Sequence, residues 1–179
     1  ASPQDMGTDF KIIPDSELVF GPMSITFDVN NYIQKYGGYL STYNEDVDGS
    51  RLSGAQIIDL VSENYSVNPR LLLSLLEYRS GWLSKIQPPS QTLDYPMGFN
   101  DPWHIGLYRQ LTWVANTLNR GYYLWKVDAL PSIILVDGLL VPLAPTINPG
   151  TAAVQYLFST LDDYSTWQFD VSPDGFFSY

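Results

Sequence analysis

The sequence of 179 residues has no cysteine and only one histidine, His104. The absence of cysteine excludes thiol catalysis, a disulfide framework and cysteine-type zinc sites. A single histidine also gives little support to a zinc site or a Ser-His-Asp triad. No glycine-rich phosphate loop is present. We therefore predict no cofactor and no metal.

Basic residues are scarce as well: nine Lys and Arg stand against 19 Asp and Glu, for a formal net charge of −10. Nucleic acid and anionic membrane surfaces both need clustered basic side chains, so neither is an expected partner. No apolar run reaches the roughly 18 residues of a membrane span. The few lysines, the many aromatic residues and a start at Ala1–Asp5 typical of a cleaved or trimmed N-terminus favour a secreted or extracytoplasmic protein.

Aromatic residues are abundant, at 15% of the chain with 13 Tyr and 5 Trp. Aromatic rings often line carbohydrate-binding clefts, although a Tyr-rich core and surface would account for them equally well. The length and the hydrophobic fraction of 45% are sufficient for a real core. We predict an extended N-terminal arm over 1–23 and a single domain over 24–179.

One stretch, residues 66–82, predicts the central helix. Asn68 is a good N-cap, Pro69 suits the first helical position and Gly81 is a natural terminator. The leucine run between them predicts burial on most faces. Near the C-terminal end, apolar neighbours and the helix dipole would both favour the protonated form of Glu77, which is the form that a general acid needs.

This stretch resembles the lysozyme-like superfamily, and within it the soluble lytic transglycosylase and goose-type lysozyme group. The matching motif there is V-x-P-x-L-L-x-A-[IL]-x-x-E-S-G-[FW], whose Glu is the catalytic acid. Residues 67–76 and 80–82 fit it. Arg79 stands at the position of the family's glutamate, and Glu77 lies two residues earlier, about 200° around a helix of about 3.6 residues per turn.

Two later segments are similar to further motifs of that group. Gly106-Leu107 and Gln110-Leu111 partly match G-L-[MF]-Q-[LIV]-x-x-x-[TA]-A, at the start of a helix predicted over 105–119 with a break near Gly121. Residues 148–157 partly match N-x-x-x-G-x-x-Y-L, in a helix with Asn as its cap and Pro at its first position. The resemblance covers roughly residues 53–160 and implies a lysozyme-like domain with a sugar cleft.

Capping and turn residues predict the remaining elements of the fold. Cap and terminator residues bound helices over 29–36 and 54–64, the latter with a capping box. An Asp-Gly pair in 132–143 predicts a hairpin with a two-residue type I′ turn. The acidic segment 44–50 copies the first half of a calcium-binding EF-hand loop, but the second half is absent, which favours a solvated turn. The predicted fold is mainly α (α+β), a lysozyme-like helical domain with a small β hairpin.

The irregular aromatic stretch 86–104 is where a cleft wall is expected. Glu77 is the predicted catalytic residue. The predicted substrate contacts are side chains that this stretch or the resemblance places near the cleft: Tyr78, Arg79, Trp82, Tyr95, Phe99, Trp103, Tyr108, Arg109 and Gln110.

Three functions follow as hypotheses. The first is a secreted glycoside hydrolase or lytic transglycosylase that acts on a β-1,4-linked amino-sugar polymer, such as peptidoglycan or a chitin-type glycan, with Glu77 as general acid. The second is a non-catalytic glycan- or peptidoglycan-binding module with a degenerate lysozyme-like fold, which Arg79 and the acidic charge favour. The third is a structural domain in which Glu77 and Arg79 belong to a local polar network.

Overall fold

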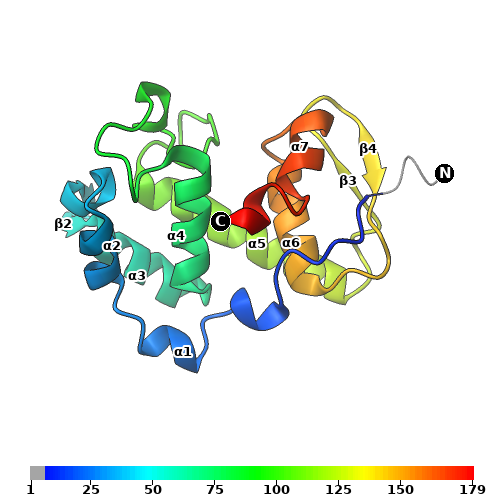
Figure 1. The fold of residues 1–179 in the computed structure, drawn as a ribbon, viewed down its shortest axis with the longest axis horizontal. Helices are drawn as coiled ribbons and strands as arrows, with labels where there is room; N and C mark the ends of the chain where they lie inside the picture. Colours follow the sequence, from blue (N-terminus) through cyan, green and yellow to red (C-terminus); the bar gives the residue numbers. More distant parts are fainter. Residues whose placement is uncertain (1–6) are drawn as a thin grey trace. The chain divides into compact units, whose positions relative to one another are not determined.

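The computed structural model describes residues 7–179, so the predicted mature N-terminus at Ala1–Asp5 lies outside the described part. The chain is mainly α with small antiparallel hairpins, which confirms the predicted α+β class (Figure 1). No helix in residues 7–179 is long and apolar enough to cross a membrane.

Contacts within the chain group into two compact units, while the arm over 1–23 and the single domain over 24–179 stay a prediction. The central unit consists of residues 19–115. The terminal unit combines the described residues up to Leu18 with residues 116–179. The N-terminal segment is part of the packing of the terminal unit: Ile12 and Leu18 are buried, and the Ile12 amide donates to the Thr151 hydroxyl at 2.9 Å.

The central unit is built from short helices and one hairpin. Its elements are α1 (Pro22–Ile25), α2 (Val29–Tyr36), β1 (Asn44–Val47), β2 (Ser50–Ser53), α3 (Gly54–Tyr65), α4 (Pro69–Ser80) and the first residues of α5 (Leu107–Lys126). Helix α3 packs against both α2 and α4 (Figure 1).

The predicted caps of α2, α3 and α4 are confirmed, whereas the helix predicted from residue 105 begins at Leu107. Asp28 caps α2 by accepting from a backbone amide, and Ser53 and Gln56 form the predicted capping box of α3. Asn68 caps α4, and Gly81 ends it in the left-handed conformation at φ 71°. A residue with a side chain would be strained at that φ, which explains the glycine.

Helix α4 is the core helix that its leucines predict. Leu72, Leu75 and Leu76 are completely inaccessible to solvent, and so are Ile57 and Ile58 of the adjoining α3. Full burial of one such side chain stabilises a fold by about 1.5–3 kcal/mol. These two helices therefore contribute much of the core of the central unit.

The two Asp-Gly pairs form different turns. Asp48 and Gly49, between β1 and β2, both have positive φ (49° and 85°), as a two-residue type I′ turn requires. The type I′ turn predicted at Asp137-Gly138 is wrong, because only the glycine has positive φ (86°). The loop there covers residues 135–139, because Ile134 pairs with Leu140.

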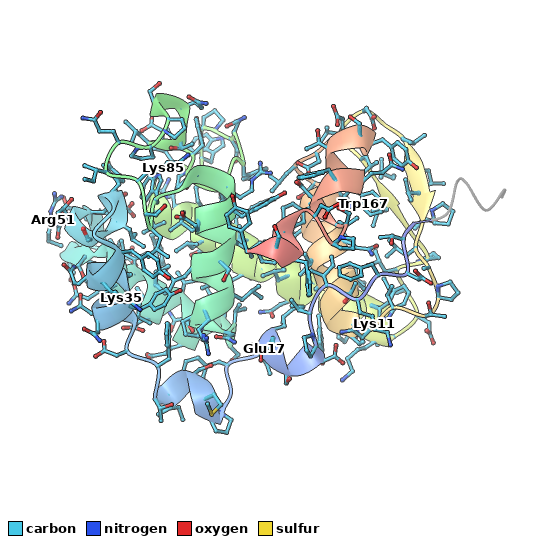
Figure 2. The ribbon with its side chains drawn as sticks, viewed as in Figure 1. Lys11, Glu17, Lys35, Arg51, Lys85 and Trp167 are labelled. Carbon is cyan, nitrogen blue, oxygen red and sulfur yellow. The ribbon has the colours of Figure 1, made fainter. Side chains whose placement is uncertain are left out.

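The terminal unit contains the rest of α5 together with β3 (Ser132–Ile134), β4 (Leu140–Pro142), α6 (Pro149–Ser159) and α7 (Tyr164–Asp170). Trp167 of α7 is 1% exposed, and its indole N–H donates to the carbonyl of Gln155 on α6. Figure 2 shows it inside this unit, whereas Arg51 extends outward from the central unit.

Two local predictions in this unit are corrected by tertiary contacts. Helix α5 continues through Gly121 without the predicted break, and a Cβ there would lie 2.8 Å from the Tyr156 ring. The glycine thus allows close packing on α6. Asn148 precedes α6 as predicted, but its side chain makes no capping bond. Asp15 accepts from the Gly150 amide instead, at 2.8 Å.

Candidate functional site

A groove of about 530 Å³ lies in the central unit, between the β1–β2 hairpin and the start of α5. We call it the tyrosine groove. Tyr39, Tyr43 and Tyr108 contribute the aromatic part of its lining. Its charged lining residues are Glu45, Asp46, Asp48, Asp94 and Arg109.

Glu45 joins the hairpin to helix α5. Its carboxylate accepts the backbone amides of Leu107 at 2.8 Å and Tyr108 at 3.3 Å, and the hydroxyl of Tyr43 also donates to it. Gly106, which directly precedes the helix, is tolerated at an N-cap but has no side chain that could accept an amide. Glu45 therefore replaces a local cap and places negative charge at the positive end of the helix dipole.

Two residues that contact the Glu45 carboxylate, Tyr43 and Gly106, have properties that fit this contact. Burial raises the pKa of Tyr43, and the hydrogen bond to Glu45 and its charge raise that pKa further. Tyr43 therefore stays protonated at neutral pH and remains a donor to Glu45. Gly106 has φ 96°, and a Cβ there would lie 2.6 Å from a carboxylate oxygen of Glu45. Only glycine meets both conditions without strain.

Beside the groove, residues 94–106 form what we call the aromatic loop. The Gly106 amide donates to the Asp94 carbonyl at 2.9 Å and closes the loop at its base. Phe99 stacks on Trp113 of α5, with ring centroids 3.9 Å apart. Trp103 is 78% exposed, so the loop presents a free indole ring next to residues that line the groove.

Gln110 holds this loop from inside. Its side-chain oxygen accepts the amides of Met97 and Phe99 at 3.2 and 3.3 Å. Its side-chain nitrogen donates to the carbonyls of Phe99 and His104 at 2.8 and 2.6 Å. Gln110 is fully buried, so this predicted substrate contact acts in the structure as a clamp on the loop.

Two arginines bind the same loop. Arg79 donates from Nε to the Met97 carbonyl at 3.0 Å, and its guanidinium packs on Gly98. Arg109 donates to the Trp103 carbonyl at 3.1 Å and also lines the groove. Arg79 thus connects α4 to the aromatic loop.

Glu77 binds the turn that follows its own helix. One carboxylate oxygen accepts the amides of Leu83 and Ser84 at 3.0 and 3.1 Å, and the other accepts the Ser84 hydroxyl. Glu77 does not belong to the lining of the tyrosine groove. The structure therefore separates the predicted general acid from that groove.

The remaining predicted contacts differ in exposure. Trp82 is fully buried and donates to the Thr92 hydroxyl at 3.2 Å, so its ring supports Tyr39 and Tyr43 from beneath instead of facing a ligand. Tyr78 and Tyr95 are half-buried and do not line the groove. Of the nine predicted contacts, Tyr108 and Arg109 line it.

The acidic segment 44–50 consists of β1, the Asp48-Gly49 turn and the first residue of β2. Within residues 7–179, no three His, Cys, Asp or Glu side chains come together as a group that could hold a metal. His104 pairs with the carboxylate of Asp101. Asp46 has an exposed ion pair with Arg51 at 3.4 Å.

Sequence reasoning did not identify Tyr39, Tyr43 or Glu45 as site residues. Glu45 lies 62 residues before the amide that it binds, so no local pattern reveals the contact. One indirect signal was available: a long helix preceded by glycine has no capping side chain of its own, so its first amides need an acceptor from elsewhere in the fold.

Comparison with known proteins gives one family. The family model described as LasA, N-terminal domain, matches residues 11–178, which cover the central unit and most of the terminal unit. No curated protein and no solved structure matches the chain.

Proposed function

We propose that this chain, which belongs to the LasA N-terminal domain family, is a non-catalytic module that binds a glycan in the tyrosine groove. The observation that carries the proposal is the lining of the groove, where three tyrosines stand among carboxylates. Aromatic faces can pack on the apolar face of a sugar ring, while carboxylates accept bonds from its hydroxyls. The exposed Trp103 extends the aromatic surface beyond the groove.

The hydrogen bonds that the Glu77 carboxylate accepts support glycan binding rather than glycan cleavage. Its carboxylate oxygens already accept three hydrogen bonds from Leu83 and Ser84. A general acid must carry a proton to the leaving group. A proton on the oxygen that faces the two amides would displace at least one of these bonds. Glu77 is thus better suited to hold the end of α4 than to donate a proton.

The charge of the groove indicates the kind of glycan. Glu45, Asp46, Asp48 and Asp94 outnumber Arg109, and the whole chain carries −10. An anionic polymer would be repelled. A neutral or cationic β-1,4-linked amino-sugar chain fits best. The family description as an N-terminal domain supports a module that acts beside the rest of a longer protein, which we propose is secreted.

Calorimetry with chitin, chitosan and peptidoglycan oligomers tests the proposal. We expect binding to at least one of them, weakened about tenfold, or about 1.4 kcal/mol, in Tyr108→Ala. Tyr123→Ala is the matched control, because Tyr123 is 64% exposed on the same helix but outside the groove lining. Absence of binding to every glycan would refute the proposal.

Product analysis separates binding from cleavage. The same glycans are incubated with the wild type and with Glu77→Gln, whose amide oxygen can still accept from the Leu83 amide. We expect no products from either protein. If a glycan-cleaving enzyme is the correct alternative, the wild type releases products and the variant loses about 10²–10⁴-fold in rate.

A further inference from the structure

A second groove lies in the central unit, distinct in its lining residues from the tyrosine groove. It has a volume of about 590 Å³ and is bounded by α1, the start of α2 and one face of α3. Phe20, Ile25 and Phe27 contribute apolar lining. Ile25 is 74% exposed and its neighbour Met23 on α1 is 77% exposed. Two large apolar side chains exposed on one short helix beside a groove indicate a contact surface.

The other wall of this groove is acidic. Asp28, Asp59 and Glu63 line it, and within the described chain no Lys or Arg does. Asp59 and Glu63 lie one turn apart on α3 and therefore repel each other. Burial raises the pKa of Asp59, and the charges of Glu63 and Asp28 raise it further. Negative charge is thus concentrated beside an apolar surface.

We propose that this acidic groove docks a short segment of a partner protein in which Lys or Arg stands next to apolar residues. Charge complementarity identifies the occupant. A cation near Asp59 and Glu63 relieves their repulsion, whereas an anion would increase it. A purely apolar ligand would remove the carboxylates from water without compensation. The apolar neighbours of the cation would cover Ile25 and Met23.

One lining ring, that of Phe27, also contacts a cation that does not line the groove. The guanidinium of Arg70 lies over the Phe27 ring, 5.4 Å from the centroid. Asp28 caps α2 through the Asn31 amide and has a structural role. Asp59 and Glu63 are therefore the carboxylates that we assign to the partner. This inference uses other residues than the proposed glycan site and stands independently of it.

Fluorescence polarisation with a labelled hexapeptide of alternating leucine and lysine tests the assignment. The wild type should bind this peptide and should not bind the counterpart in which glutamate replaces lysine. The double variant Asp59→Asn/Glu63→Gln should weaken binding at least tenfold, and Ile25→Ser should weaken it several-fold. Affinity should fall as salt is added, because exposed charges are screened.

The control variant Asp46→Asn/Asp48→Asn makes the same change in net charge at the tyrosine groove. It should leave the affinity for the peptide within twofold. Equal weakening in both double variants would show general attraction to an acidic protein and would overturn the inference. If the wild type does not bind the leucine-lysine peptide at low salt, the inference is overturned as well. If a chitosan oligomer displaces the peptide and responds equally to Asp59→Asn/Glu63→Gln, the groove belongs to a cationic glycan instead.

Discussion

Replacing Gln110 by leucine tests whether one buried amide holds the aromatic loop in place. The two side chains are similar in size, so the change removes hydrogen bonds while keeping the volume. It removes the partner of the Met97 and Phe99 amides and of the His104 carbonyl, while the Phe99 carbonyl still accepts the Asp101 amide. Helix α5 itself keeps its backbone bonds, so the damage should be confined to the loop and its attachment.

The size of the effect follows from the burial of these groups. Met97 is fully buried, so its amide should cost the full penalty of an unpaired buried group, about 1–3 kcal/mol. Phe99 and His104 are half-buried, so water can reach their groups after a small shift. We expect a loss of roughly 3 kcal/mol, against the roughly 5–15 kcal/mol by which domains are usually stable. At about 2 kcal/mol/M, the urea midpoint should fall by about 1.5 M.

Urea unfolding followed by tryptophan fluorescence measures this shift, and hydrogen exchange of the Met97 and Phe99 amides locates it. Thr112→Val is the matched control on the same helix, because the Thr112 hydroxyl is buried without a hydrogen-bond partner in the described chain. That variant should be neutral or slightly stabilising. Unchanged protection of both amides in Gln110→Leu would refute the clamp.

Two further predictions concern titratable groups. Glu45→Gln should lower the Tyr43 pKa, which an absorbance titration can follow, and should cost about 0.3–2 kcal/mol through the lost charge at the start of α5; an unchanged Tyr43 titration would contradict the assigned contact. Burial, Glu63 and Asp28 raise the Asp59 pKa in the folded state, so the folded protein binds more protons there and loses stability as pH rises through that pKa. Asp59→Asn should therefore raise the melting temperature at pH 7 and give no advantage below the unfolded pKa of 3.8; equal effects at both pH values would argue against the shift.

Much of the local structure was determined by the sequence alone. The starts of α2, α3 and α4 lie where Asp28, Ser53 and Asn68 predict them. Each of these caps binds an amide two or three residues away, so nothing outside the segment is needed. The left-handed end of α4 at Gly81 is equally local. The burial of α4 also follows from its composition, because leucine covers most of its faces, while Arg70 is exposed and Ser74 half-buried on the remaining side.

Tertiary structure decided which carboxylate binds which backbone amide when the two lie far apart in the sequence. Glu45 binds α5 across 62 residues, and Asp15 binds the start of α6 across 135 residues. The two Asp-Gly pairs show the same dependence, since strand register places only Asp48-Gly49 in a two-residue turn. A local pattern specifies what a side chain can donate or accept. Only the packed fold brings the partner within about 3 Å, the distance at which that capacity becomes a bond.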